Sequence, residues 1–409
     1  MKILIVSDVY PPEPRGGAKH TRVLAEHLSQ RGHRVVVCTT AFPGLSRCTT
    51  EDEGVVVYRL QGFFSRIPFL YQDRVGRFPP PLKDWLLTKQ LRKIIKEENP
   101  DIVHAVGWMF YSLLPALNGL GAPLVMSLLD LRAICPAAGM LPEAASCDMH
   151  LSLRCVACGR GLYGSGPLGS AKSLGTYLAT RTNKKKLGSV DTFIVLSSYA
   201  KQLHMTHLGL EEHRFAVIPN FYDREPDTGI GHSGKLPEDF ILFVGALLPA
   251  KGVGVLIKAY RRLNTETKLV VIGLKHPRYS YSGGNGVVLI ENAPRSLVLQ
   301  AFDSCRFAVF PSVWPESSST VMLEAMAGEK AVVGSRIGGL SELIVDGDTG
   351  ILVPPKDAEA LSEAMSYLLQ NPQVAEHMGQ RGYERWKQLF TTDAVTPEIE
   401  KLYESLLGK

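Results

Sequence analysis

The first forty residues read MKILIVSDVYPPEPRGGAKHTRVLAEHLSQRGHRVVVCTT, and this stretch decides the fold class. The β-branched apolar run Ile3–Val6 predicts a buried strand, and Arg34–Thr39 predicts a second one. Between them, residues 18–30 place apolar side chains on one helical stripe. A strand, a helix and a second strand in this order form a βαβ unit, and such units build parallel sheets covered by helices. The stretch therefore predicts an α/β fold.

A second α/β block begins near residue 239. Phe240–Val244 and Lys268–Ile272 are predicted strands, each followed by glycine. The 409 residues fit two domains at roughly 100–200 residues each. We expect two doubly wound, Rossmann-like domains that face each other across a cleft, with ligands at the carboxyl ends of both sheets. The predicted parts are an N-terminal acceptor-side domain 1–215 with a Cys-rich insertion near 131–165, a linker 216–238, a donor-side domain 239–389, and a helix within 390–409 that packs back on the first domain.

The overall composition is that of a globular protein, with 45% hydrophobic and 21% charged residues. The chain has no run of 18 apolar residues, and its first apolar run is too short for a signal peptide, so we expect a cytoplasmic location. Residues 1–200 carry 24 Lys and Arg against 15 Asp and Glu. This excess indicates either an anionic partner or a solvated basic surface.

The most informative segment follows a predicted strand that ends at Phe310. Glu316 lies in a loop, the run Ser317–Thr320 supplies residues that cap helices, and strong helix formers follow. A helix that begins there would aim its N–H groups and its dipole at a diphosphate. Glu324 lies inside that helix, so the two carboxylates would grip hydroxyls at different depths of one ligand. Two solvated glutamates are the alternative.

Two weaker signals also point to anion binding. Gly16 and Gly17 stand between the first strand and the first helix, where glycine lets backbone N–H groups approach an anion. An ordinary turn is the alternative. Lys251 lies in the loop after the strand Phe240–Val244 and beside Gly252 at a helix start, where its ammonium can act as a point charge on phosphate.

Together these motifs resemble the retaining glycosyltransferases of family 4, which have the two-domain GT-B architecture. The Glu-x7-Glu pair Glu316 and Glu324, followed by Ala-Met-Ala-Gly, is the most specific element of the resemblance. The resemblance runs over nearly the whole chain and includes Arg31–His33, Pro100–His104, Val217–Asn220, Gly338–Glu342 and Asp346–Pro354.

The resemblance implies a role for each site residue. The donor is a nucleotide sugar, with UDP and GDP both open, and no catalytic metal is expected. Glu324 would hold the ribose hydroxyls and Glu316 would contact the donor sugar as a catalytic group. The other donor-binding residues are Ser319, Thr320 and Lys251 at the diphosphate, and Gly16 and Gly17 closing from the N-terminal side.

The chain departs from the family pattern at two positions. Ala246 stands where the family usually has Arg, so one cation at the diphosphate is missing. Leu129 stands where the family often has His, beside Asp130, which keeps the acidic residue of that pair and is the second catalytic candidate. Arg132 and His104 are candidates to substitute for the missing groups.

Four cysteines form a cluster with the spacing C-x11-C-x7-C-x2-C: Cys135, Cys147, Cys155 and Cys158. A Cys-x2-Cys pair with two further thiolates can complete a structural zinc site, and a subset of family 4 resembles this insertion. Four reduced thiols in a long loop are the alternative. The glycine-rich residues 164–169 match a dinucleotide-binding pattern, but Pro167 interrupts it and no strand precedes it, so a loop is predicted there.

Residues 59–96 carry nine Lys and Arg against two Asp, with aromatic residues interleaved. Such a segment suits an anionic membrane surface, on which a lipid-linked acceptor would dock. Core aromatics beneath a basic face are the alternative. Lys184–Lys186 form a second basic cluster without an assigned use.

The leading hypothesis is a retaining glycosyltransferase that extends a glycan or glycolipid in cell-surface polysaccharide synthesis. We expect it in the cytoplasm, peripheral on the inner face of the cell membrane. The alternative is a non-catalytic GT-B protein that binds a nucleotide sugar or a partner, which Ala246 and Leu129 favour. A nucleotide-sugar epimerase fits Glu316 and Glu324 less well, and nucleic-acid binding leaves these paired glutamates unexplained.

Overall fold

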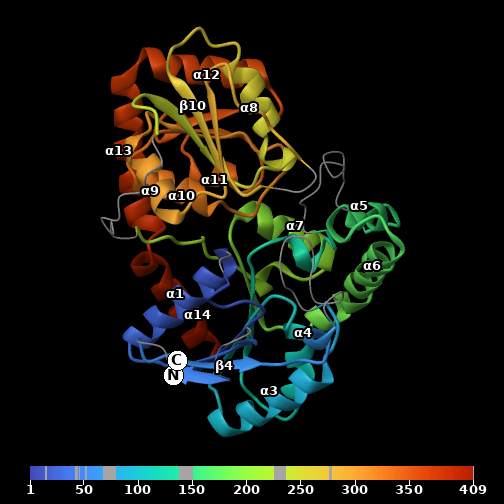
Figure 1. Cartoon of the computed structure of the whole chain (residues 1–409). Coiled ribbons are helices and arrows are strands. Elements are labelled where there is room, and N and C mark those ends of the chain that lie inside the picture. The colour runs from blue at the N-terminus through green and yellow to red at the C-terminus, as the bar shows by residue number, and fades with distance from the viewer. Residues whose placement is uncertain are drawn as a thin grey trace. The chain divides into compact units, whose positions relative to one another are not determined.

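The computed structural model describes residues 1–13, 16–41, 45, 47–50, 53–67, 80–137, 151–224, 236–275 and 279–408. The chain divides into two compact units. Figure 1 shows the ribbon coloured by residue number along the chain. The first unit contains the described residues up to Ile218 together with those from Val395 onward, and the second is Pro219–Ala394. No helix in the described ranges has the length and apolar character needed to cross a membrane.

The first unit is built on a sheet that has eight strands in the described residues, in the order β3-β4-β2-β1-β5-β6-β7-β8. All neighbouring strands are parallel except the antiparallel pair β3 and β4. The strands are β1 (Lys2–Ser7), β2 (Arg34–Thr40), β3 (Cys48–Thr50), β4 (Val56–Leu60), β5 (Ile102–Val106), β6 (Leu124–Leu128), β7 (Thr192–Val195) and β8 (Phe215–Val217). The predicted α/β class is therefore correct, and the predicted linker 216–238 begins within β8.

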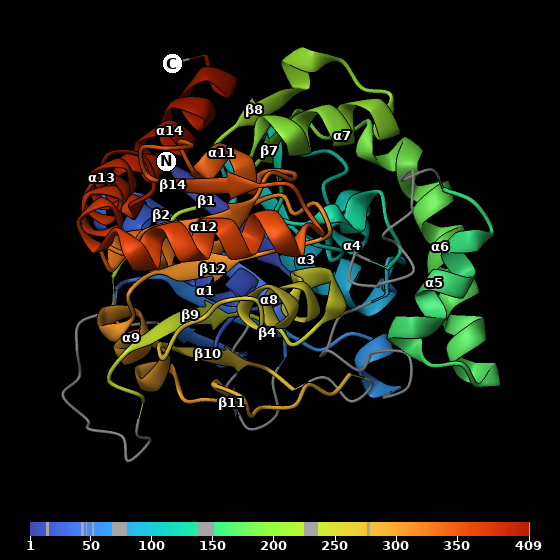
Figure 2. The same ribbon diagram turned by 90° about the horizontal axis from the view of Figure 1, so that it is seen from above.

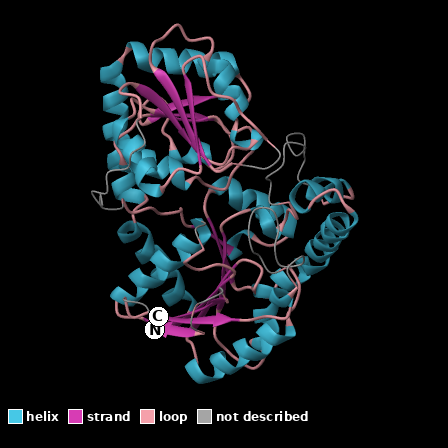
Figure 3. Ribbon diagram, in the orientation of Figure 1, coloured by secondary structure: helices cyan, strands magenta, loops and turns pink. Residues whose placement is uncertain are grey.

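Helices enclose this sheet, as Figure 3 shows. The helices of the unit are α1 (Gly16–Gln30), α3 (Trp85–Glu98), α4 (Phe110–Leu113), α5 (Arg154–Tyr163), α6 (Pro167–Leu187), α7 (Ser198–Leu208) and α14 (Thr392–Leu406). The side chains of β1 alternate between the two faces of the sheet: Leu4 and Val6 join one core with α3, α4 and α7. Ser7 points to the other face, where its Oγ lies 3.2 Å from Oγ1 of Thr21 in α1.

The last helix, α14, packs on the first unit and lies beside α1 in Figure 1. The hydroxyl of Tyr403 lies 2.7 Å from Nδ1 of His104 in the middle of β5. Glu400 accepts a hydrogen bond from Arg31 at 2.5 Å and lies 2.6 Å from His33. These polar contacts fix the helix on the face of the sheet that α1 also covers.

Helices α5 and α6 form a hairpin, and they lie side by side in Figures 1 and 2. The loop predicted over 164–169 is only partly correct, because Pro167 opens α6. Proline is favoured at the first position of a helix, where its missing N–H costs nothing. Gly169 lets the two helices meet, since a Cβ atom there would lie 2.2 Å from the carbonyl oxygen of Gly164.

The second unit has a parallel sheet of six strands in its described part, in the order β11-β10-β9-β12-β13-β14. The strands are β9 (Phe240–Val244), β10 (Lys268–Gly273), β11 (Val287–Glu291), β12 (Ala308–Phe310), β13 (Val332–Ser335) and β14 (Gly350–Val353). The helices are α8 (Val253–Tyr260), α9 (Arg295–Ser304), α10 (Thr320–Ala327), α11 (Leu340–Leu343), α12 (Ala358–Gln370) and α13 (Pro372–Leu389).

Both faces of this second sheet are buried. One core contains residues of α8 and α12, which Figure 2 shows side by side, and the other contains residues of α9, α10 and α13. Strands buried on both faces are apolar along their whole length, as Phe240–Val244 is. The unit is doubly wound, and in such sheets ligands bind beyond the carboxyl ends of the strands.

Candidate functional site

Two predicted site residues of the second unit meet because their strands are neighbours. Lys251 ends the short 3₁₀ turn Pro249–Lys251 after β9, and Glu316 lies in the loop after β12. The two loops also touch through the backbone, where the Val313 N–H donates to the Ala250 carbonyl at 2.9 Å. The carboxyl ends of β9 and β12 therefore carry one site.

Glycine allows these loops to come so close. Gly252 has φ +75°, and a Cβ atom on it would lie 1.8 Å from the carbonyl oxygen of Pro311. Gly338, with φ +57°, approaches Glu316 from the other side: its Cβ atom would lie 2.7 Å from the Glu316 carbonyl oxygen. The N–H of Gly339 donates to that same oxygen at 2.8 Å. The backbone of Glu316 is thus held between two loops.

The side chain of Glu316 is held as firmly as its backbone. Lys251 Nζ donates to Oε2 of Glu316, and the Ser312 hydroxyl donates to Oε1 at 2.6 Å. The Glu316 side chain is 19% exposed and that of Lys251 is 30% exposed, so the pair faces a partly wet site. A charged pair at this depth can exchange partners with a ligand, because each group can reach solvent.

The N-terminus of α10 opens into the same loop. Ser319 is the N-cap in extended conformation, and its side chain makes no capping hydrogen bond. The Asn220 side-chain amide donates to Oγ1 of Thr320 at 3.0 Å. The Ser318 hydroxyl is buried without a hydrogen-bond partner in the structure. A helix terminus with uncapped N–H groups and a nearby hydroxyl suits an anion.

Glu324 lies one turn deeper, and the structure gives it a partner that sequence reasoning missed. Its side chain is 7% exposed, and Arg295 Nη1 donates to its Oε2 at 2.7 Å. Arg295 opens α9, and its guanidinium lies 5.9 Å from the ring centre of Tyr222. No periodicity joins residues 295 and 324, so the sequence carried no signal for this pair.

In the first unit, Asp130 lies beyond the carboxyl end of β6 and caps the short 3₁₀ turn Leu131–Ala133. It accepts hydrogen bonds from the backbone N–H of Arg132 at 2.8 Å and from Arg132 Nε at 2.7 Å. Arg132 also lies 3.6 Å from Asp8, so one guanidinium serves two carboxylates. Arg132 was one of two candidates to replace the histidine missing at Leu129. It pairs with Asp130, the residue that follows Leu129.

Asp8 is a buried acid that sequence reasoning left in a loop. It follows β1 and accepts hydrogen bonds from the N–H groups of Trp108 at 2.7 Å and Met109 at 2.5 Å. Burial raises the pKa of Asp8, while Arg132 and these two N–H groups act to lower it. Gly107 makes room for the carboxylate, since a Cβ atom on it would lie 2.2 Å from Oδ2 of Asp8. The sequence did contain a signal for Asp8 as a site residue, because it directly follows a buried strand, and ligand sites lie at the carboxyl ends of parallel strands.

The glycine pair lies at the start of α1. A Cβ atom on Gly16 would meet nothing within 4 Å, and one on Gly17 would meet only Cγ2 of Val9 at 3.8 Å. Packing inside the described chain therefore does not require glycine at either position.

His104 does not substitute for the missing histidine, and this expectation was wrong. The residue is fully buried in β5, between the Tyr403 hydroxyl at 2.7 Å and the Ser127 hydroxyl at 2.7 Å. Burial lowers the pKa of His104 to about 3, so its ring is neutral at physiological pH. It belongs to the core rather than to a ligand site.

The predicted cysteine site and basic surface are described only in part. Cys147 lies outside the described residues, and within them no group of three or more His, Cys, Asp or Glu is placed to hold a metal ion. The zinc site stays a prediction. Of the segment 59–96, residues 68–79 are also outside, and Arg59 is buried, where it donates to Oγ1 of Thr49 at 2.7 Å. Trp85 remains at the surface, 59% exposed.

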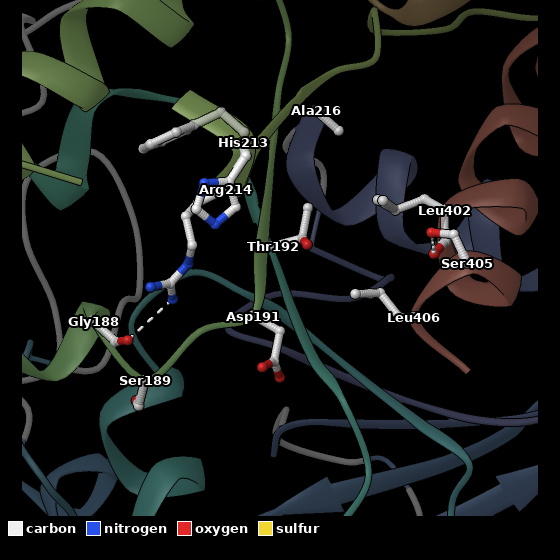
Figure 4. A pocket seen from close by; sticks show the side chains of 11 residues that line it. Gly188, Ser189, Asp191, Thr192, His213, Arg214, Ala216, Leu402, Ser405 and Leu406 are labelled. Atoms are coloured by element: carbon white, nitrogen blue, oxygen red, sulfur yellow. Dashed lines mark hydrogen bonds between the residues drawn. The ribbon is translucent and has the colours of Figure 1, made fainter. Parts of the chain in front are cut away.

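A pocket of about 770 Å³ opens elsewhere in the first unit, at the amino ends of β7 and β8 (Figure 4). Arg214 donates to the Gly188 carbonyl at 3.0 Å on one side of it, and Ser405 and Leu406 of α14 face it from the other. The Asp191 carboxylate accepts a hydrogen bond from the N–H of Leu124 at 2.7 Å. The amino ends of parallel strands lie opposite the edge where Asp130 is found, so this pocket is not the predicted site.

Two family models match the chain. A model described as Glycosyltransferase Family 4 matches residues 14–226, more than half of the chain. A model described as Glycosyl transferases group 1 matches residues 232–385, which include Lys251, Glu316 and Glu324.

Individual proteins with similar sequences carry related names. An uncharacterized glycosyltransferase of Methanocaldococcus jannaschii is 32% identical over 220 residues, which are 53% of this chain and 60% of the relative. The capsular polysaccharide biosynthesis glycosyltransferase CapM of Staphylococcus aureus is 25% identical over 224 residues, 52% of this chain and 59% of CapM. The chain thus matches about three fifths of these relatives' length. A second uncharacterized M. jannaschii glycosyltransferase is 26% identical and matches over 99% of this chain and 98% of its own.

Solved structures share the fold over the full length. Sucrose-phosphate synthase from Thermosynechococcus elongatus has a TM-score of 0.71 at 18% identity and covers 100% of both chains. Anabaena HepE in complex with UDP-glucose has a TM-score of 0.66 at 16% identity, with 99% of this chain and 100% of HepE covered. At these identities the likeness concerns the fold.

Proposed function

This chain belongs to glycosyltransferase family 4 and has the GT-B fold, and from that premise we propose that it transfers a sugar from a nucleotide-diphosphate sugar to a glycan or glycolipid acceptor. The family and the fold predicted from the sequence are confirmed. The proposal for the reaction adds retention of the anomeric configuration and a role in cell-surface polysaccharide synthesis. The name of the matching relative CapM supports the latter.

The observation that carries the proposal is the arrangement at the carboxyl ends of β9 and β12. A lysine, a carboxylate and the uncapped N-terminus of α10 lie together there, with a second, buried carboxylate one turn into the helix. A nucleotide sugar offers matching groups in order: a sugar with hydroxyls, a diphosphate and a ribose. The solved complex of Anabaena HepE with UDP-glucose supports a donor of this class, and UDP and GDP both remain candidates for this chain.

The proposed donor contacts follow from charge. Lys251 and the N–H groups at Ser319 and Thr320 would hold the diphosphate, and Glu324 would accept hydrogen bonds from ribose hydroxyls. As the diphosphate enters, Lys251 would leave Glu316 for the phosphates, and the freed carboxylate would accept a hydrogen bond from a hydroxyl of the donor sugar. Positive charge aimed at a leaving diphosphate lowers the barrier to its departure, which is the largest contribution expected here.

The first unit would supply the acceptor side. Asp130, oriented by Arg132, and the open backbone at Gly16 and Gly17 lie at the carboxyl ends of its strands. Arg132 provides a cation near the position where Leu129 replaces a histidine. We place the enzyme in the cytoplasm, at the membrane through the exposed residues of 59–96, such as Lys83 and Trp85.

A donor screen tests the proposal. The protein would be incubated with UDP- and GDP-sugars, with and without lipid-linked acceptors, and release of the nucleotide diphosphate would be followed. Release with one donor class, lost in Glu316→Ala and kept in the exposed control Glu363→Ala, is expected. Absence of release under every condition would overturn the transferase proposal.

A non-catalytic GT-B protein is the second candidate, and Ala246 favours it. The family's usual arginine is absent there, and Lys251 is the cation that faces Glu316 from the β9 loop. The same screen separates the two candidates: tight donor binding without release would indicate a binding protein.

A further inference from the structure

Helix α6 has an inverted distribution of side chains. Its buried face consists mainly of small and polar residues, among them Gly169, Ser173, Thr176, Thr180 and Asn183. Large apolar residues lie on the opposite, exposed face. A surface helix of a globular protein normally shows the reverse arrangement, so this exposed face is poorly suited to water.

The exposed residues form one continuous stripe, which we call the α6 face: Leu168, Ala171, Leu174, Leu178, Arg181 and Lys185. Their spacing of three or four residues places them on one side of a helix. Leu168 is 67% exposed, Leu174 is 42% exposed and Leu178 is 47% exposed. The stripe changes from leucine to basic residues toward the C-terminal end of the helix.

The stretch of sequence that contains this face carries charge of a single sign. Residues 151–190 contain seven Lys and Arg and no Asp or Glu, and Lys184 and Lys185 are both exposed. On the buried side of α6, the side-chain amide of Asn183 donates to the Pro81 carbonyl at 2.6 Å. That bond brings the end of α6 next to Leu82, which is 46% exposed, and to the exposed Lys83.

From these observations we propose that the α6 face docks the protein on an anionic lipid bilayer, with its leucines in the acyl boundary and its basic residues at the headgroups. Exposed leucines beside lysines and arginines, in a stretch of sequence that has no Asp or Glu between residues 151 and 190, match that surface in both polarity and charge. A nucleic-acid site would offer aromatic stacking platforms, and leucine is under-represented among the dominant residues of protein interfaces. The inference goes beyond the proposed transfer reaction and does not depend on it.

Vesicle binding of the full chain tests this directly. Co-sedimentation would be measured with phosphatidylcholine vesicles that do or do not contain phosphatidylglycerol. We expect binding only to the anionic vesicles, weakened by salt. Replacing Leu168, Leu174 and Leu178 with Gln should lower the partition coefficient at least about tenfold. Replacing Lys184 and Lys185 with Gln should lower it about fivefold for each charge removed.

Matched variants keep the test specific. Leu274→Gln combined with Lys258→Gln changes an exposed leucine and an exposed lysine of the second unit and should leave vesicle binding unchanged. Thermal unfolding should be the same in all variants, because the altered side chains are exposed. The transferase assay is a separate readout, so vesicle binding and catalysis can fail independently.

Three results would overturn the proposal. The first is that the wild-type chain fails to bind anionic vesicles. The second is that binding is lost in the α3 variant Lys89→Gln with Lys96→Gln but kept in the α6 variants. The third is that the leucine variant changes the oligomeric state in light scattering while its vesicle binding persists. The second result would place the membrane surface on α3 alone, and the third would identify the α6 face as a contact between copies of the chain.

Discussion

A Cβ atom on Gly252 would lie 1.8 Å from the carbonyl oxygen of Pro311, so the loop after β9 lies too close to the end of β12 for any side chain at this position. Lys251 immediately precedes this contact, and Glu316 follows it by a few residues. The ion pair between them depends on it.

Gly252→Ala is therefore expected to separate the two loops. The left-handed φ of +75° and the clash with Pro311 should together destabilise the fold by about 2–4 kcal/mol and lower donor turnover. Gly254→Ala is the control, because a Cβ atom there meets nothing within 4 Å and alanine favours the helix. Urea unfolding and nucleotide release would be measured on both; equal stability of the two variants would contradict this account of the loop contact.

Lys251→Ala should lower kcat/KM by about a hundredfold, the usual effect of removing one group that stabilises a leaving anion. Affinity for the free nucleotide diphosphate should fall as well, because the charge also acts in the ground state. Lys258→Ala, on the exposed side of α8, should behave as wild type. Initial rates over a range of donor concentrations check the prediction, and an unchanged kcat/KM would remove Lys251 from the site.

The pair Arg295 and Glu324 makes two different predictions. Glu324→Gln should weaken nucleotide binding about tenfold or more in calorimetric titrations, because a charged acceptor for the ribose hydroxyls is lost. Arg295→Met should instead lower the free energy of unfolding by about 3 kcal/mol, because it removes the paired guanidinium from a carboxylate that is only 7% exposed. If Arg295→Met were as stable as the wild type, the pair would have no structural role.

Stability should depend on pH through His104. Its folded-state pKa of about 3 lies below the ordinary value of 6.5, so only the unfolded chain takes up this proton as the pH falls through that range. Above about pH 6.5, His104 has no effect on how stability changes with pH, because its ring is neutral in both states. Below that pH, protonation of the unfolded chain lowers the free energy of unfolding by up to about 1.4 kcal/mol per pH unit. His104→Gln should show a shallower decline between about pH 7 and 5 in urea titrations than wild type or the exposed control His377→Gln. Identical slopes would contradict the prediction.

Strands buried on both faces were the part of the fold most accessible from sequence. The strands at Phe240–Val244 and Lys268–Ile272 were predicted to within one residue of the bounds that the structure has, because an apolar run between turn residues allows few alternatives. Helix α6 was missed for the opposite reason. Its buried face consists mainly of small and polar residues, so the sequence shows no apolar stripe at helical spacing on that face.

In the candidate site too, local features could be predicted from the sequence and contacts between distant segments could not. Each loop could be placed at the end of its own strand, but that Lys251 contacts Glu316 follows from β9 lying beside β12, which is a matter of strand order. Asp8 contacts Trp108 and Met109 across 100 and 101 residues, and no local pattern records a contact of that range.

Because of helix α14, cleaving the backbone between the two units would leave the first unit incomplete. Its first turn is tied to the second unit, where the Thr392 N–H donates to Asp223 at 2.9 Å, and from Val395 onward it belongs to the first. A cut between residues 218 and 219 would therefore not release two complete halves. The amino-terminal fragment would expose the side of the sheet on which Tyr403 meets His104, and only a peptide containing α14 would restore it.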